Sequence, residues 1–137
     1  MPKYIAFLRA INVGGHTVKM DYLRSLFEAA GFANVETFIA SGNVIFDSKA
    51  KNTKTLEQKI EKHLLAELGY AVTTFIRATS ELAEIANYNS FTKAELNEAS
   101  NTFYIGFLAE RPSDEAKQKL LSLAGATDDF AVHEREV

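Results

Sequence analysis

Apolar residues recur along the chain with two different periods, and each period predicts one kind of element. Residues 4–11 form a mostly apolar run of β-formers, which predicts a strand that ends before Gly14 and Gly15. An apolar stripe with spacings of three and four residues then predicts a helix that ends at Gly31. The stripe consists of Met20, Leu23, Phe27 and Ala30.

Two further runs of β-formers, residues 35–40 and 44–46, flank Ser41, Gly42 and Asn43. Glycine and asparagine tolerate the positive φ of tight turns, so these runs predict a β-hairpin. The rest of the chain continues the two periods and predicts a helix at 54–68 that ends at Gly69, a strand at 71–76, a short helix at 80–86, a strand at 103–108, a helix at 112–124 and a strand at 130–137.

The first six elements follow the order βαββαβ, which predicts an α+β fold with a ferredoxin-like N-terminal lobe and an antiparallel sheet. We expect this lobe at residues 1–78 and a smaller C-terminal βα lobe at residues 79–137, together forming one compact domain. In a ferredoxin-like lobe the loop at 12–19, the hairpin turn at 41–43 and the turn at Gly69-Tyr70 emerge at the same edge of the sheet. We therefore expect these three segments to be neighbours.

This sheet edge is the candidate binding site. Two adjacent glycines let the backbone approach a ligand closely, the following helix presents free N–H groups, and Arg9 and Lys19 add positive charge. Such a site suits phosphate or carboxylate, so we expect a small anionic ligand. The alternative is that the glycines only form a tight turn, and the sequence favours neither interpretation. The candidate ligand-binding residues are Arg9, Asn12, Gly14, Gly15, His16, Lys19, Ser41, Gly42 and Asn43.

Patterns typical of catalysis or metal binding are missing from the sequence. His16 is the best-placed titratable residue, but none of the three histidines stands in an HxxxH or HxH pattern, which argues against a metal site. No GxxxxGK[ST] loop occurs, and Ser41 lies outside any GxSxG elbow. The sequence therefore assigns no catalytic residue, cofactor or metal, and it leaves open whether the protein is an enzyme.

Composition is that of an ordinary globular protein. The 137 residues are 47% hydrophobic and 24% charged, which is enough for one buried core. The absence of cysteine excludes disulfides and thiolate chemistry. The apolar run before Arg9 spans only five residues, too short for a signal-peptide core or a membrane span, so we expect a cytoplasmic protein with no membrane partner.

Charge is distributed unevenly along the chain. Residues 1–62 carry nine Lys or Arg against six Asp or Glu, whereas residues 63–137 carry six against twelve. An anionic ligand would therefore prefer the first half, although ordinary solvated side chains explain so small an imbalance as well.

Aromatic residues on the predicted strands raise a second interpretation. With Tyr4, Phe7 and Phe46 on strands, the βαββαβ order is also typical of the RNA-recognition motif. However, the third strand lacks the basic and aromatic pattern of that motif, and the pI is only about 5.6. We therefore expect these aromatics in the core and no nucleic-acid partner. The alternative function is a module that binds a partner protein or a nucleic acid without catalysis.

Residues 8–20 and 37–46 resemble the signature of the bacterial domain-of-unknown-function family 1697, in which an LRGINVGG-like segment precedes a TYIQSGNVVF-like hairpin. The resemblance implies no known reaction or ligand. Members of that family continue through a further strand segment, so the resemblance implies a chain that is either truncated or naturally short. The segment 130–137 would then be an exposed strand edge through which homo-oligomers could form.

Overall fold

The structure is a computed structural model, and it describes residues 1–12, 15–38, 42–88, 91, 98, 100–125 and 128–137. The chain divides into two compact units, residues 1–86 and residues 87–137. Each unit is described by itself below.

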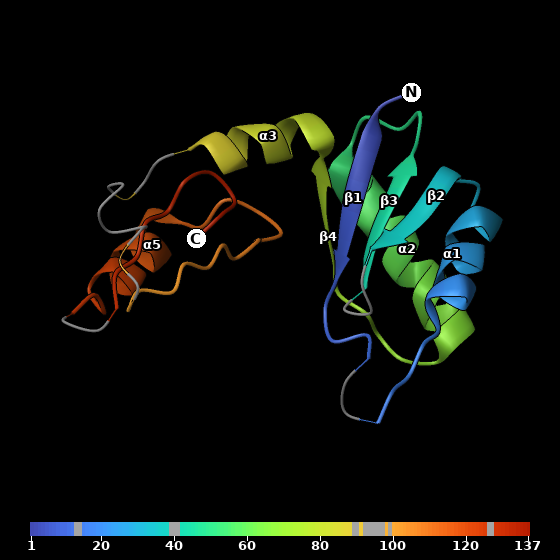
Figure 1. Cartoon of the computed structure of the whole chain (residues 1–137), viewed down its shortest axis with the longest axis horizontal. Helices are drawn as coiled ribbons and strands as arrows, with labels where there is room; N and C mark the ends of the chain where they lie inside the picture. The colour runs from blue at the N-terminus through green and yellow to red at the C-terminus, as the bar shows by residue number, and fades with distance from the viewer. Residues whose placement is uncertain (13–14, 39–41, 89–90, 92–97, 99, 126–127) are drawn as a thin grey trace. The chain divides into compact units, whose positions relative to one another are not determined.

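A four-stranded sheet forms the centre of the first unit (Figure 1). Its strands are β1 (Lys3–Leu8), β2 (Ala33–Phe38), β3 (Asn43–Asp47) and β4 (Thr74–Ala78). Their spatial order is β2-β3-β1-β4, and every neighbouring pair is antiparallel. The α+β class and the antiparallel sheet predicted from the sequence are confirmed.

Two helices, α1 (Met20–Ala29) and α2 (Thr53–Leu68), cover one face of this sheet (Figure 1). Helix α2 ends at Gly69, whose φ of 82° is accessible to glycine at little cost and whose N–H donates to Leu65 O at 3.0 Å. The core between the helices and the sheet consists of Tyr4, Ala6, Leu8, Ile11, Val18, Leu23, Leu26, Phe27, Phe32, Val35, Val44, Phe46, Leu56, Ile60, Leu64, Val72 and Ile76.

Several strand boundaries differ from the prediction. Strand β2 begins at Ala33 instead of residue 35, and β3 begins at Asn43, which was predicted in the turn. Strand β1 ends at Leu8 rather than at residue 11, because Ala10 has a φ of 55° and turns the chain away from the extended direction. Ile11 is nevertheless buried, with 1% of its surface exposed, so its apolar character reflects core packing after the strand. Strand β4 begins at Thr74 and continues to Ala78, slightly later than the predicted 71–76.

The helix predicted at 80–86 is present as α3 (Thr79–Asn87), and it follows β4 directly. Glu81 Oε1 accepts a hydrogen bond of 3.0 Å from Ala78 N, so the glutamate caps the backbone at the junction between strand and helix.

The second unit differs more from the prediction. Helix α5 (Asp114–Leu121) forms as expected, and its N-cap Ser113 accepts a hydrogen bond of 3.1 Å from Ala116 N. The strands predicted at 103–108 and 130–137 are wrong, because the described residues there form only isolated bridges, Phe107 with Glu136 and His133 with Glu136. Glu134 has a φ of 53°, which turns the chain between the two bridging residues and prevents a regular strand.

Candidate functional site

The loop that follows β1 and the hairpin turn between β2 and β3 meet at one end of the sheet in the first unit. We call this end the loop edge and define it by the described residues 9–12, 15–19, 42–43 and 69–73. Leu8 N donates a hydrogen bond of 3.0 Å to Gly42 O, and Arg9 N donates one of 2.9 Å to Thr73 O. The hairpin turn and the chain entering β4 therefore flank the end of β1, as the βαββαβ order predicts. Gly14 and Ser41, two of the candidate residues, lie outside the described residues.

Gly42 occupies a position that no other residue fits. It is buried, its φ is 90°, and a Cβ placed on it would lie 2.6 Å from Ile11 Cγ2 and 3.2 Å from Leu8 Cβ. Gly42 therefore lets the hairpin turn pack directly onto the chain that leaves β1. This role is structural, and it brings the two loops together.

Asn12 also has a structural role. Its Oδ1 accepts a hydrogen bond of 2.6 Å from Val18 N, which closes the loop that contains Gly15 and His16. Val18 belongs to the core, and this bond satisfies its backbone N–H. The structure thus assigns Asn12 to holding the loop in shape.

His16 stacks on Tyr70. The ring centroids are 3.8 Å apart with an interplanar angle of 18°, and Tyr70 Oη donates a hydrogen bond of 3.2 Å to Ile11 O. The imidazole itself is exposed. Tyr70 was not among the candidate residues predicted from the sequence, although the expected position of the Gly69-Tyr70 turn at this edge was a signal for it.

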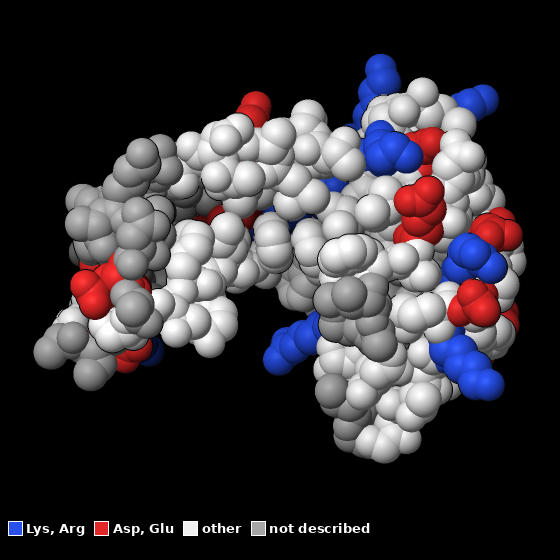
Figure 2. All heavy atoms as spheres, in the orientation of Figure 1, with Lys and Arg blue, Asp and Glu red and all other residues white. Residues whose placement is uncertain are grey.

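Arg9 and Lys19 provide the charge of the loop edge. Both are exposed, and they are the only Lys, Arg, Asp or Glu among its described residues. Neither side chain forms an ion pair with any residue that the structure describes. Arg24, in contrast, lies 3.5 Å from Asp21 and 3.6 Å from Glu28. On the side of the first unit that faces the viewer in Figure 2, basic and acidic side chains are interspersed.

Asn43 lies on the other face of the sheet, which we call the outer face because α1 and α2 cover the opposite one. It is paired in register with Phe7 of β1 and Phe38 of β2. Phe75 of β4 is opposite Phe7, so phenylalanines on three of the four strands share this face, with Asn43 between Phe38 and Phe7. Phe38 is 60% exposed. Tyr4 and Phe46 lie in the core as expected, whereas Phe7 faces away from it.

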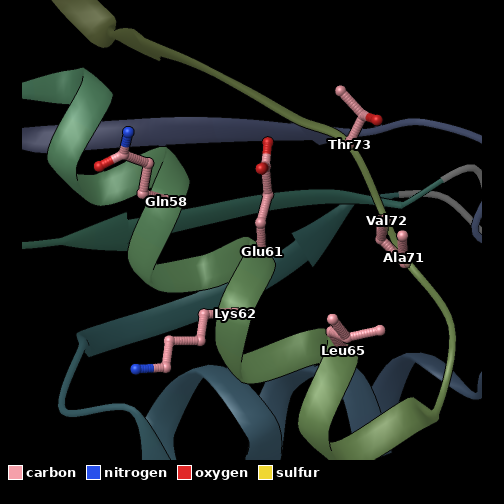
Figure 3. A pocket seen from close by; sticks show the side chains of 7 residues that line it. All are labelled: Gln58, Glu61, Lys62, Leu65, Ala71, Val72 and Thr73. Atoms are coloured by element: carbon pink, nitrogen blue, oxygen red, sulfur yellow. The ribbon is translucent and has the colours of Figure 1, made fainter.

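A groove of about 340 Å³ runs between α2 and the chain that enters β4 (Figure 3). Figure 3 shows Glu61 extending from α2 toward this chain, whereas Lys62 points away from it. Glu61 Oε1 accepts a hydrogen bond of 3.1 Å from Thr74 N. The groove is lined by Gln58, Glu61, Lys62, Leu65, Ala71, Val72 and Thr73. None of these residues was a candidate from the sequence.

The described part of the chain contains no cluster of three His, Cys, Asp or Glu side chains arranged to hold a metal ion. Among the same residues, no helix combines the length and the apolar character needed to cross a membrane.

Comparisons with known proteins agree with the resemblance noted in the sequence. The fold is similar to that of the conserved bacterial protein SP0830 from Streptococcus pneumoniae, with a TM-score of 0.71 and 21% sequence identity over 91% of this chain and 67% of that one. A search of curated proteins finds no match. The family model described as "Protein of unknown function (DUF1697)" matches residues 1–137, and the chain therefore belongs to this family.

Proposed function

We propose that the first unit binds a small anionic ligand at the loop edge. The observation that carries this proposal is the isolation of Arg9 and Lys19, two exposed cations with no acidic residue among the described residues of the edge. An exposed cation with no acidic partner nearby is available to pair with an anionic ligand. Guanidinium and ammonium groups are the usual partners of phosphate and carboxylate.

The loop between these cations is braced in advance. Asn12 ties the loop to Val18, and the Tyr70 hydroxyl ties it to Ile11 O. A site whose residues are held in place before the ligand binds loses less binding free energy to the ordering of those residues. His16, held on the Tyr70 ring, adds a hydrogen-bond donor or a flat surface for a planar ligand.

The proposal also includes the ferredoxin-like arrangement of this unit. The strand order β2-β3-β1-β4 and the two helices on one face support it. This arrangement explains why segments distant in sequence emerge together at the loop edge, so the ligand site depends on the topology rather than on one motif.

Titration of the whole chain with inorganic phosphate, pyrophosphate and a small dicarboxylate tests the proposal, followed by chemical shifts of the loop-edge amides. We expect at least one probe to shift the amides of Gly15 to Lys19. Arg9→Ala and Lys19→Ala should each weaken binding by about tenfold to a hundredfold, because a hydrogen bond to a charged group contributes roughly 1.5–3 kcal/mol.

Arg24→Ala is the matched control, since Arg24 is also exposed in the first unit but already has two acidic partners. It should leave the affinity unchanged. If no probe shifts the loop-edge amides, or if Arg24→Ala weakens binding as much as Arg9→Ala, the proposal is wrong.

A second candidate is binding of single-stranded nucleic acid on the outer face, and one observation favours it. Phe7, Phe38 and Phe75 lie on that face, Phe7 and Phe75 on adjacent strands and Phe38 two strands from Phe7, and bases stack on such rings. Glu36 is aligned with Ile45 on the same face and opposes a polyanion. We therefore rank this candidate below the anionic small molecule.

A further inference from the structure

Side chains of this chain form hydrogen bonds with the backbone of β4 along its outer edge, meaning the side that does not pair with β1. Strand β4 is the last strand of the sheet order. Arg9 N donates to Thr73 O, and hydrogen-bonded pairs alternate along antiparallel strands. Phe75 and Arg77 therefore bond to β1, whereas the backbone N–H and C=O groups of Thr74, Ile76 and Ala78 point to the outer edge.

Three of these outward backbone groups form hydrogen bonds with side chains. Glu61 Oε1 of α2 accepts from Thr74 N at 3.1 Å, and Glu81 Oε1 of α3 accepts from Ala78 N at 3.0 Å. Between them, Arg77 Nη1 donates to Ile76 O at 2.9 Å. The three contacts come from three different elements and fall on three successive outward positions of one strand.

We infer that Glu61, Arg77 and Glu81 close the outer edge of β4 against pairing with the β4 strand of a second copy of this chain. An unpaired strand edge is a template for such pairing, and native proteins block it with charged side chains. A strand added at this edge would need the N–H groups that the two glutamates hold and the carbonyl that the arginine holds.

A second copy fits the edge because the outward positions of β4 are spaced evenly on both sides of Ile76, so two copies of the strand can pair with each other. In an antiparallel β4–β4 pair centred on Ile76, Thr74 of one copy lies opposite Ala78 of the other. Each N–H released by a glutamate would then face a backbone carbonyl of the partner strand. Leu65, which is 50% exposed in the adjacent groove, adds apolar surface beside the edge.

The test compares the molar mass of the full chain with that of the double variant Glu61→Ala and Glu81→Ala, by light scattering over a wide range of protein concentration. We expect the variant to gain mass with concentration toward twice the mass of the wild-type species. The double variant Glu61→Gln and Glu81→Gln keeps an acceptor oxygen at both positions and should behave as the wild type.

The double variant Glu67→Ala and Glu84→Ala is the matched control, because it removes one exposed carboxylate from each of the same two helices. It should not gain mass. The inference is overturned if the first variant remains folded by circular dichroism without added mass, or if the Glu67 and Glu84 variant gains as much.

Hydrogen exchange of the wild-type chain gives a test that requires no variant. The Thr74 and Ala78 amides should exchange at least about tenfold more slowly than in an unfolded peptide, since carboxylates hold both. Unprotected exchange at both amides overturns the inference even if the alanine variant fails to fold.

Discussion

Gly42 and Ile11 touch so closely that a Cβ on the glycine would lie 2.6 Å from Ile11 Cγ2. This contact joins the hairpin between β2 and β3 to the chain that leaves β1. The absence of a Cβ at residue 42 sets how closely these two segments can approach each other. Disruption of this contact should therefore affect the fold before it affects any ligand.

Gly42→Ala should destabilise the first unit strongly. The φ of 90° imposes strain of roughly 1–3 kcal/mol on any L-residue, and the clash with Ile11 adds an overpacking cost of about 1–3 kcal/mol. Urea unfolding followed by circular dichroism measures the sum. Gly31→Ala is the control, because Gly31 has a φ of 95° but nothing within 4 Å of its added Cβ. Equal losses for the two variants would show that the contact with Ile11 has no energetic role.

Asn12→Ala should lower the free energy of unfolding by about 1–3 kcal/mol, since it leaves the part-buried N–H of the core residue Val18 without its acceptor. Asn12→Asp keeps an oxygen at the same position and should restore most of the loss. Denaturant unfolding of the two variants measures this difference. If Asn12→Ala unfolds like the wild type while ligand binding disappears, Asn12 contacts the ligand instead of bracing the loop.

Asp47 should make the stability of the first unit depend on pH in the acid range. Asn34 Nδ2 donates to Asp47 Oδ2 at 2.7 Å, and Lys3 Nζ lies 3.2 Å from Oδ1. These contacts hold the pKa of Asp47 below its usual range. The stabilisation is therefore complete above the pKa of an unfolded aspartate, about 3.9, and is lost as the pH falls toward the lower pKa of the folded state.

Urea unfolding at a series of acid pH values checks this expectation. The free energy of unfolding of the wild type should approach that of Asp47→Asn as the pH falls. Asn34→Ala removes the largest cause of the lowered pKa and should reduce the pH dependence while leaving the carboxylate in place. A constant difference between wild type and Asp47→Asn across this range would contradict the prediction.

The helices and strands of the first unit were predicted well because the spacing of apolar residues along the sequence follows from core packing. Leu23 and Phe27 of α1 and Leu56, Ile60 and Leu64 of α2 recur at helical spacing because each helix buries one face, and all five are buried. Such patterns are local and can be read residue by residue.

Contacts between distant segments were not predictable in the same way. Tyr70 and Ile11 are 59 residues apart, and Glu61 reaches Thr74 from another element. No local pattern signals either contact. In the second unit the alternation of Phe130, Val132 and Val137 with polar residues suggested a strand, but a single positive φ at Glu134 interrupts it. One backbone conformation of that kind outweighs a short alternating pattern.

Single-stranded RNA or DNA should not bind the outer face with both high affinity and steep salt dependence. Tight backbone binding needs clustered Lys and Arg, and Lys3 on this face already pairs with Asp47 at 3.2 Å. Glu36 adds a negative charge close to the phenylalanines. Fluorescence anisotropy with labelled oligonucleotides, measured over a range of salt concentrations, tests this expectation.

Phe38→Ala makes the same experiment decisive. Phe38 is 60% exposed, so its removal should change stability little and any stacking on the outer face strongly. We expect wild type and variant to bind oligonucleotides equally weakly. Submicromolar binding by the wild type that weakens steeply with salt and disappears in Phe38→Ala would instead make the outer face a nucleic-acid site. The anionic group recognised by this protein would then be a polynucleotide backbone rather than a small molecule at Arg9 and Lys19.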